Sequence, residues 1–310
     1  MQELNRKIVV LGTGGTLAGV SAQPGDNIGY TAAQIGVAEF LAAIPALAAR
    51  RIECEQVAQV DSKDMGFAIW RDLAQRCAHW LAHGDVAGIV VTHGTDTLEE
   101  TAFFLQEVLQ PAKPVVITCA MRPATALSPD GPQNIVDAVA VASAAAAQGV
   151  VAVCAGVIHD ARHVMKVHHL RLDPFSSGDA GAVGYVEDGV VRLVRPWPAA
   201  QRGSLLAKLG LREQWPRVEI VTSCAGATGA IVEALVAQGV DGLVVAATGN
   251  GTVHRDMLPA LLAAQSKGLK VVRASRCAEG GVIASADDEL ASTMLSPVKA
   301  RIEMMLSLLA

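Results

Sequence analysis

The chain has 310 residues, of which 51% are hydrophobic and 18% are charged. These values are typical of a globular protein with a sizeable buried core, and the length allows one large domain or two unequal ones. The formal net charge of −5 provides no basic surface for nucleic acid or an anionic membrane, so neither is expected as a partner.

A mean hydropathy of +0.36 requires a search for membrane-spanning segments. The longest stretch without a charged residue covers 138–158, but it is rich in alanine and is interrupted by Gln148 and Gly149. We predict the end of a helix followed by a buried strand there, and no membrane span. Glu3 and Arg6 precede the first strand without an apolar segment, so we predict no secretory signal and a cytoplasmic location.

The six cysteines are widely spaced and contain no C-x-x-C pair. Their even number leaves disulfides possible, but the spacing does not suggest a disulfide framework. We expect free, packed thiols, as in a reducing compartment.

Short runs rich in valine and isoleucine alternate along the chain with longer alanine- and leucine-rich segments of helical period. This alternation is typical of a mostly parallel sheet covered by helices. The predicted strands cover 7–12, 87–92, 114–118, 150–158, 218–222, 242–246 and 270–274. The predicted helices cover 66–83, 97–110, 133–148, 227–238, 255–267 and 297–309. The segment 182–194, with a charged turn ending in Gly189, predicts a hairpin.

A domain boundary is predicted near Pro196 and Pro198, because proline stops both a helix and a strand ladder. Beyond the polar stretch that follows, a new series of alternating strands and helices begins. We therefore predict an α/β fold with two domains. A larger N-terminal domain (1–195) has a mostly parallel sheet flanked by helices, and a linker (196–216) leads to a smaller C-terminal α/β domain (217–310).

The first two predicted strands end in polar loops that contain glycine. These loops read GTGGTLAG (12–19) and THGTDTLEET (92–101). In open parallel sheets, ligands bind beyond the carboxyl ends of the strands, and glycine lets the backbone turn sharply there. The hydroxyls of Thr16 and Thr95 would then be open to a ligand.

A nucleotide site was considered for the first loop. Its glycine spacing is neither G-x-G-x-x-G nor that of a P-loop, and the following segment, 20–30, has the composition of a polar loop. A phosphate site would need a helix N-terminus there, so a nucleotide is not expected. In the second loop, Thr97 and Glu100 have the spacing of a capping box, which predicts a structural role for Thr97.

The two loops resemble the two signature segments of the bacterial-type L-asparaginase/glutaminase family. The similarity continues, in the family's order and over nearly the whole chain, through GYTAAQIGV (29–37), DSKDM (61–65), RHVMK (162–166), GNG (249–251) and SPVKAR (296–301). The resemblance implies two α/β domains and a homotetramer built as a dimer of dimers. It also implies active sites between neighbouring subunits and a small amino acid as substrate.

Roles follow from the resemblance residue by residue. Thr16 matches the nucleophile of the family, and Tyr30 matches the residue on a mobile lid that helps to activate it. Thr95 and Lys166 match a second threonine and its lysine, which activate the nucleophile or the attacking water.

Further matches concern the substrate. Ser62 and Asp96 match the residues that hold its α-amino and α-carboxylate groups, and Gly94 and Lys63 are expected beside them. Asp96 would supply the negative charge that an ammonium group requires.

Amide hydrolysis explains why these residue types occur together. A carboxamide is a poor electrophile, so dividing the reaction into acylation and deacylation lowers each barrier. A threonine hydroxyl is a weak nucleophile that needs a base, and a lysine shielded from water can serve as one. Backbone N–H groups of the glycine loops could form an oxyanion hole, worth about 3–4 kcal/mol per donor. No G-x-S-x-G motif suggests a serine triad.

The histidines at 163, 168 and 169 surround Lys166 in the sequence and raise the question of a metal. They lack a repeated i, i+4 ligand spacing with a carboxylate, and hydrolysis by threonine needs no metal. We predict neither a metal nor a cofactor. Taken alone, Lys166 would be expected to be a solvated surface lysine.

The chain departs from the family pattern at three places. Lys63 stands where the secreted enzymes usually carry glutamine or another uncharged or acidic residue, so we hypothesise that its charge binds the α-carboxylate or alters selectivity. Thr252 follows GNG where asparagine is common. The acidic residue that crosses the subunit interface is not identified, and the candidates are Glu279, Asp287, Asp288 and Glu289.

The sequence therefore predicts hydrolysis of L-asparagine to L-aspartate and ammonia. A broad-specificity glutaminase-asparaginase is an alternative, because one methylene changes discrimination by only about 1–3 kcal/mol. A non-catalytic amino-acid sensor is a second alternative, which would be expected to lack a catalytic hydroxyl or the lysine.

Overall fold

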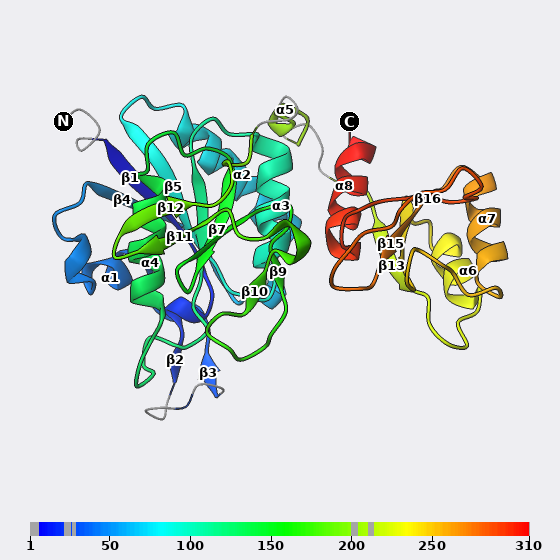
Figure 1. Ribbon diagram of the computed structural model, residues 1–310, viewed down its shortest axis with the longest axis horizontal. Helices are drawn as coiled ribbons and strands as arrows, with labels where there is room; N and C mark the ends of the chain where they lie inside the picture. Colours follow the sequence, from blue (N-terminus) through cyan, green and yellow to red (C-terminus); the bar gives the residue numbers. More distant parts are fainter. Residues whose placement is uncertain (1–5, 22–25, 27–28, 200–203, 210–213, 310) are drawn as a thin grey trace. The chain divides into compact units, whose positions relative to one another are not determined.

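The computed structural model describes residues 6–21, 26, 29–199, 204–209 and 214–309. The chain divides into two compact units, Met1–Leu206 and Ala207–Ala310, and each has a sheet covered by helices (Figure 1). Each unit has its own hydrophobic core. The predicted two-domain α/β fold is confirmed.

Within the described residues, the larger unit contains an eight-stranded sheet of order β12-β11-β8-β7-β6-β5-β1-β4. Its parallel strands are β4 (Ile52–Val60), β1 (Lys7–Gly14), β5 (Val86–Thr92), β6 (Val115–Thr118) and β7 (Val150–Cys154). The antiparallel strands are β8 (Val157–Asp160), β11 (Gly184–Glu187) and β12 (Val190–Leu193). Because β1 and β5 are parallel neighbours, with Gly12 opposite Thr92, the loops that carry Thr16 and Thr95 leave the sheet side by side.

Helices cover both faces of this sheet (Figure 1). They are α1 (Val37–Ala42), α2 (Phe67–Leu81), α3 (Leu98–Leu109) and α4 (Gly131–Ala142). Successive strand residues point to opposite faces, so Val10, Val90 and Val116 share one core cluster with Phe40 of α1 and Ile135 of α4. Helices α2 and α3 pack on the other face, against β5 and β7. Burying each of these large side chains stabilises the fold by about 1.5–3 kcal/mol.

Several short elements join the larger ones. They are β2 (Val20–Ser21), β3 (Tyr30–Thr31), β9 (Met165–Lys166), β10 (Phe175–Ser176), α5 (Leu206–Leu209) and the 3-10 turns Thr16–Ala18, Pro45–Leu47, Ser62–Asp64 and Gly178–Ala180. β2 pairs with β3, and β9 pairs with β10, each as a two-residue antiparallel ribbon. These short elements were not predicted, although they carry Thr16, Tyr30, Ser62 and Lys166.

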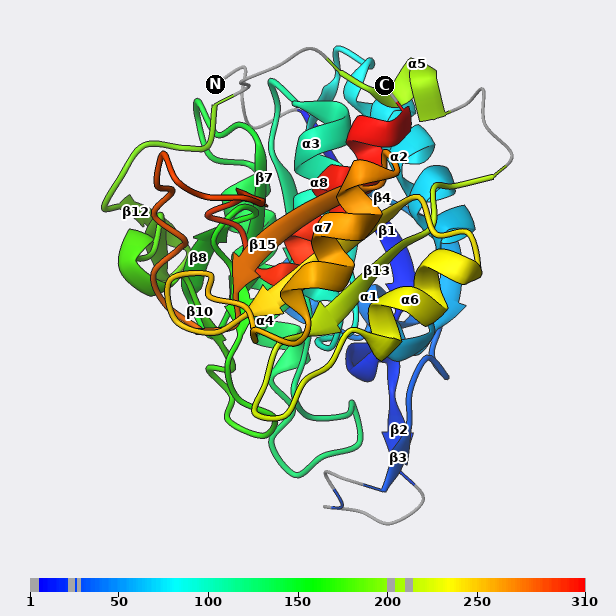
Figure 2. The ribbon, with the colours of Figure 1, turned by 90° about the vertical axis from the view of Figure 1, so that its right-hand side faces the viewer.

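In the smaller unit, the described strands β13 (Val218–Thr222), β14 (Gly242–Ala247), β15 (Lys270–Ser275) and β16 (Ala291–Ser292) form a parallel sheet. Its longer helices are α6 (Ala230–Ala237), α7 (Leu258–Ser266) and α8 (Pro297–Leu309). Helices α6 and α7 cover one face and α8 covers the other (Figure 2). The bounds predicted for β13 and α8 are confirmed. Helices α6 and α7 each begin three residues later and end one residue earlier than predicted.

In the larger unit, two predictions were wrong and one strand was missed. The apolar run 150–158 forms two strands, because Ala155 and Gly156 adopt positive φ angles of 50° and 74° and turn the chain back. Helix α4 ends at Ala142, and the alanine-rich tail that follows forms turns instead. Strand β4 was not predicted, because its sequence IECEQVAQV is polar on the exposed side of this edge strand.

The charge-free stretch 138–158 is accounted for by this arrangement. It contains the end of α4, a turn, β7 and the start of β8. No helix in the described part of the chain combines the length and the apolar character needed to cross a bilayer.

Candidate active site

The loop after β1 packs directly against the loop after β5. Gly15 has a φ angle of 85°, and a Cβ atom there would overlap the backbone of Gly94. A Cβ at Gly94 would in turn overlap the side chain of Ser62. Only glycine permits these approaches without rearrangement, so the two glycines bring the segments of Thr16, Thr95 and Ser62 together.

Thr16 lies at the start of a 3-10 turn and is 6% exposed. Its Oγ1 is 2.7 Å from the hydroxyl oxygen of Tyr30, and either group can be the donor. The ribbon of β2 and β3 carries Tyr30 back over the turn, and the absence of a side chain at Gly19 leaves room for the phenol ring. The predicted nucleophile and its predicted partner are therefore in hydrogen-bond contact.

The phenol of Tyr30 is half-buried. Burial raises its pKa above the ordinary value of 10.0, and the charges of Asp61 and Asp96 raise it further, while the hydrogen bond to Thr16 lowers it. Tyr30 is therefore protonated near neutral pH, and the pair it forms with Thr16 consists of two neutral hydroxyls.

Thr95 and Lys166 form a second pair. The Lys166 ammonium donates to Thr95 Oγ1 at 2.7 Å and to Asp96 Oδ1 at 2.6 Å. Thr95 is 6% exposed, and the side chain of Lys166 is 16% exposed against 55% for Asp96. Because Lys166 occupies the oxygen of Thr95 as a donor, the hydroxyl proton of Thr95 remains available to another acceptor.

Ser62 lies against the loop that follows β5 and is 2% exposed. Its Oγ accepts from the backbone N–H of Asp96 at 3.2 Å, and its carbonyl oxygen accepts from the hydroxyl of Thr97 at 2.8 Å. Thr97 thus occupies the N-cap position of α3 without a side-chain capping bond, so the predicted capping box was wrong. The Thr97 hydroxyl instead binds the Ser62 segment to the loop that follows β5.

Lys63 points toward carboxylates of its own turn. Its side chain is 62% exposed, and its ammonium forms an ion pair with Asp64 and lies 3.7 Å from Asp61. The hydrogen bond to Asp64 raises the pKa of Lys63. Desolvation opposes this rise, and the charges of Asp64 and Asp61 add to it. Its predicted contact with substrate remains a prediction.

A buried hydrogen-bond chain supports the Thr95 loop from below. Trp70 Nε1 donates to Thr101 Oγ1 at 2.8 Å, and Thr101 lies 2.9 Å from His93 Nε2. His93 Nδ1 is 2.7 Å from the carbonyl oxygen of Gly94, which fits a proton on Nδ1. Burial lowers the pKa of His93 to about 4, so the ring is neutral at physiological pH.

Two further contacts were not predicted from the sequence. The carboxylate of Glu99, in the first turn of α3, accepts from the backbone N–H of Lys166 at 3.5 Å. His168 Nδ1 accepts from the backbone N–H groups of Leu170 and Arg171, each at 3.0 Å. No group of three or more His, Cys, Asp or Glu side chains within the described ranges is arranged to hold a metal ion.

Asp288, one of the interface candidates, and Thr252 both have partners within the smaller unit. Asp288 lies 2.7 Å from Arg273, and accepts from the backbone N–H of Ser285 at 2.9 Å. That backbone bond, with Arg273, lowers the Asp288 pKa. Thr252 Oγ1 is 2.8 Å from Thr248 Oγ1, so the residue after GNG closes its own turn. A role across a subunit interface remains a prediction for Glu279, Asp287, Asp288 and Glu289.

Both units of the chain match family models of asparaginases. Residues 7–199 match the family model "Asparaginase, N-terminal", and residues 217–310 match "Glutaminase/Asparaginase C-terminal domain". L-asparaginase 2 of Bacillus subtilis is 37% identical, and the match covers 97% of this chain and 82% of the relative. L-asparaginase 2 of Escherichia coli is 36% identical over 97% of this chain and 88% of its own.

Two other relatives extend the comparison. Glutaminase-asparaginase of Pseudomonas fluorescens is 34% identical over 97% of this chain and 86% of the relative. The crystal structure of a probable cytoplasmic L-asparaginase from Campylobacter jejuni superposes with a TM-score of 0.91 at 38% identity, covering 98% of this chain and 95% of the other. With both family models matched and one third or more of the residues identical over nearly its full length, this chain belongs to the asparaginase family.

Proposed function

We propose that this protein hydrolyses the side-chain amide of L-asparagine to L-aspartate and ammonia through an acyl-enzyme on Thr16. One observation carries the proposal: two threonines on adjoining loops each have a hydrogen-bond partner at 2.7 Å that can move or orient a proton. The family membership and the L-asparaginases among the relatives support the same reaction.

Acylation would begin with attack by Thr16 Oγ1 on the amide carbon. Tyr30 is in contact with this oxygen and is suited to relay its proton. The proton reaches the departing nitrogen, ammonia leaves, and an aspartyl ester of Thr16 forms. Backbone N–H groups of the two glycine loops are suited to stabilise the oxyanion of the tetrahedral intermediate.

Deacylation would use the second pair. Thr95, held by Lys166, orients a water molecule toward the ester carbon. The water proton passes to the oxygen of Thr16, and L-aspartate is released. The buried environment of Thr95 and Lys166 strengthens these electrostatic interactions relative to those in bulk water.

The substrate backbone would bind beside these pairs. Asp96 provides a carboxylate for the α-ammonium group, Ser62 a hydroxyl for the α-carboxylate, and Gly94 leaves space at the close approach of the loops. Asp96 already binds the Lys166 ammonium, so a bound substrate would share this carboxylate with the lysine.

Hydrolysis of L-glutamine as well is the nearest alternative, since relatives include glutaminase-asparaginases. Ammonia release from L-asparagine, D-asparagine, L-glutamine and β-aspartyl peptides tests both. Thr16→Ala and Thr95→Ala are the controls: Thr16→Ala should release no ammonia above background, and Thr95→Ala about one equivalent per enzyme without rapid turnover. Asparagine binding without turnover by the parent protein would instead support an amino-acid sensor, which the presence of Thr16, Thr95 and Lys166 argues against.

We further propose a homotetramer, built as a dimer of dimers, and a cytoplasmic location. The tetramer follows from the family resemblance, and the location is supported by the Campylobacter jejuni relative, which is described as a probable cytoplasmic L-asparaginase. Light scattering after size-exclusion chromatography should give four times the chain mass of 32.1 kDa. A monomer with full activity would contradict shared active sites.

A further inference from the structure

Lys166 is carried by a very short structural element. The ribbon consists of β9 and β10, with Lys166 opposite Phe175 and Met165 opposite Ser176. A two-stranded ribbon is at best marginally stable on its own, and this one has only two residues in each strand. Its position must therefore be fixed by contacts outside the ribbon.

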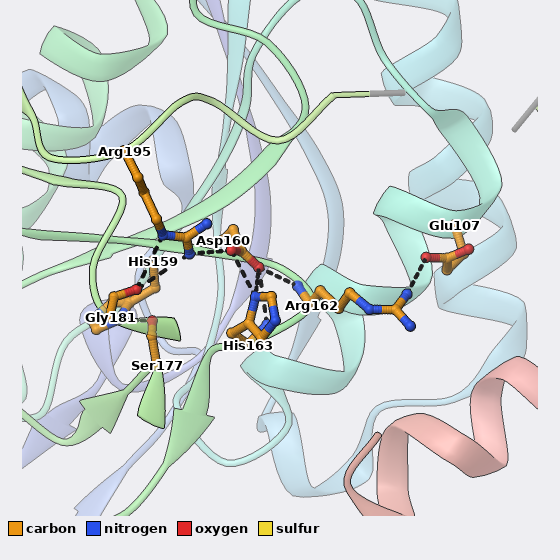
Figure 3. Close-up of polar contacts among 8 residues, drawn as sticks. All are labelled: Glu107, His159, Asp160, Arg162, His163, Ser177, Gly181 and Arg195. Carbon is orange, nitrogen blue, oxygen red and sulfur yellow. Dashed lines mark hydrogen bonds and ion pairs between the residues drawn. The ribbon is translucent and has the colours of Figure 1, made fainter. Parts of the chain in front are cut away.

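Asp160, the last residue of β8, organises the turn that leads into β9 (Figure 3). Its Oδ1 accepts from the backbone N–H groups of Arg162 and His163 at 2.9 and 3.0 Å, and its carbonyl oxygen accepts from Val164 N–H at 2.9 Å. The His163 ring contacts Oδ2 at 2.8 Å, and Arg195 donates to the same oxygen. One residue thus bonds three consecutive positions of the turn, which ends immediately before β9.

The carboxylate of Asp160 is a buried, permanent negative charge. It is 5% exposed, and burial alone would raise its pKa, but the hydrogen bonds and charges of His163 and Arg195 hold the pKa well below its usual range. Arg195 also donates to the carbonyl oxygen of Gly181 at 3.2 Å, so the ion pair joins two segments of the unit. The other charged neighbour is Arg162, which pairs with Glu107 at 3.7 Å.

His159, which precedes Asp160 in β8, contacts the residue that follows β10. Neighbouring strand residues point in opposite directions, and His159 Nδ1 lies 2.8 Å from Oγ of Ser177, the residue directly after β10. Burial lowers the pKa of His159 to about 4, so this contact is made by a neutral ring. Adjacent residues of β8 therefore contact the turn that leads into β9 and the residue that follows β10.

We propose that Asp160, with Arg195 as its counter-ion, is a positioning residue for Lys166, and that His159 supports it through Ser177. The inference rests on the proposed role of Lys166 in activating Thr95. The Lys166 ammonium has to reach Thr95 and Asp96 at 2.7 and 2.6 Å together, and a shift of the ribbon would break these contacts. Loss of the Asp160 charge would leave Arg195, whose side chain is 28% exposed, without its counter-ion, and it would place an amide donor against the donors of Arg195 and His163.

The test compares Asp160→Asn with Glu187→Gln. Glu187 makes a similar ion pair with Arg192, but it is exposed, and both residues lie on the β11–β12 hairpin. We expect kcat for asparagine to fall about 10–100-fold in Asp160→Asn, by analogy with the loss of groups that orient metal ligands, with a smaller change in KM. Glu187→Gln should behave like the parent protein. Asp160→Asn with the parent kcat would overturn the proposal.

The Lys166→Met background separates positioning from a general loss of stability. If Asp160 acts through Lys166, the double variant Asp160→Asn/Lys166→Met has the same residual rate as Lys166→Met alone. If Asp160→Asn lowered kcat by the same factor in Lys166→Met as in the parent, the proposal would be overturned, because Asp160 would then act independently of Lys166. Lys166→Met with the parent rate would instead contradict the proposed function.

Ser177→Ala provides a milder disturbance of the same ribbon. It removes one hydrogen bond and no charge, and we expect kcat to fall about threefold in the parent background and not at all in Lys166→Met. If Asp160→Asn does not fold, the effects of Ser177→Ala in the parent and in Lys166→Met test the proposal instead. A parent kcat in Ser177→Ala, or equal losses in both backgrounds, would then overturn the proposal.

Discussion

Thr16 and Thr95 lie in similar backbone settings but different electrostatic ones. Both follow a glycine beyond a parallel strand, both are 6% exposed, and both have one partner at 2.7 Å. The partner of Thr16 is the neutral phenol of Tyr30, whereas the partner of Thr95 is the ammonium of Lys166, which is also bound to Asp96. The hydroxyl beside a neutral relay is suited to attack, and the one held by a cation is suited to orient water.

The two pairs also differ in how the chain builds them. Tyr30 is 14 residues from Thr16, and one local ribbon joins them. Lys166 is 71 residues from Thr95, and it lies in the chain between β8 and β11, two strands of the antiparallel edge of the sheet. The first pair therefore depends on local structure and the second on the wider fold, which gives four ways to test the comparison.

The largest effect is expected from removing each hydroxyl. Thr16→Ala and Thr95→Ala should each lower kcat by about 10³-fold or more, because residues that act as one unit lose nearly all activity together. Mass spectrometry after acid quenching should find an aspartyl adduct on Thr16 in Thr95→Ala, and none in Thr16→Ala. Thr222→Ala, at an exposed threonine of β13, is the control. An adduct on Thr95 would reverse the assigned roles.

Tyr30→Phe tests the neutral character of the first pair. We expect kcat to fall about 10²-fold, the lower end of the range for loss of a group that transfers a proton. Because burial raises the pKa of Tyr30, the phenol keeps its proton through neutral pH. The ratio of parent to variant kcat/KM should therefore be constant between about pH 6 and 9. A ratio that rises steadily across this range would show that the phenolate is the active form.

The same division between local and distant contacts explains what the sequence could predict. Strands such as β5, β6 and β13 are apolar runs with a single structural solution, so their positions followed from composition and period. The turn at Ala155 and Gly156 could not be predicted, because a positive φ at an alanine depends on the strands that it joins. β4 is half-exposed at the sheet edge, where polar residues hide the strand pattern.

For the site, motifs predicted which residues matter but not how they are held. The resemblance names Thr16, Tyr30, Thr95, Asp96 and Lys166. The contact of Thr16 with Tyr30 is local, whereas the contacts of Lys166 with Thr95 and Asp96 join distant segments. The supporting contacts are between distant segments whose residue types are ordinary. An aspartate at a strand end or a glutamate in a first helical turn has many structural roles, and only the fold distinguishes among them.

His93 supports the loop of Thr95 and not that of Thr16. Its titration makes the stability of the protein depend on pH in the acid range. Its folded-state pKa of about 4 lies below the ordinary 6.5, so the unfolded chain binds the extra proton first. The stability this buried neutral ring contributes is present above about pH 6.5 and is lost as pH falls toward 4.

We therefore expect both proteins to lose stability between about pH 7 and 5. The free energy of unfolding should fall by about 1–2 kcal/mol more in the parent than in His93→Gln. Urea unfolding at both pH values measures this difference. His159 titrates in the same direction and remains in both proteins, so it cancels in the comparison. An equal drop in the two proteins would contradict the assignment.

Lys63→Gln should give the smallest effect. Because the Lys63 ammonium is 62% exposed and engaged by Asp64 and Asp61, solvent screens its influence, and reaching a substrate would require exchanging these partners. We expect the ratio of kcat/KM for asparagine to that for glutamine to change by about two- to threefold, within the range that one methylene controls. Lys267→Gln, an exposed lysine of the other unit, is the matched charge control. If both variants keep the parent ratio, then Lys63 only neutralises its own turn, and selectivity depends on the two threonine loops.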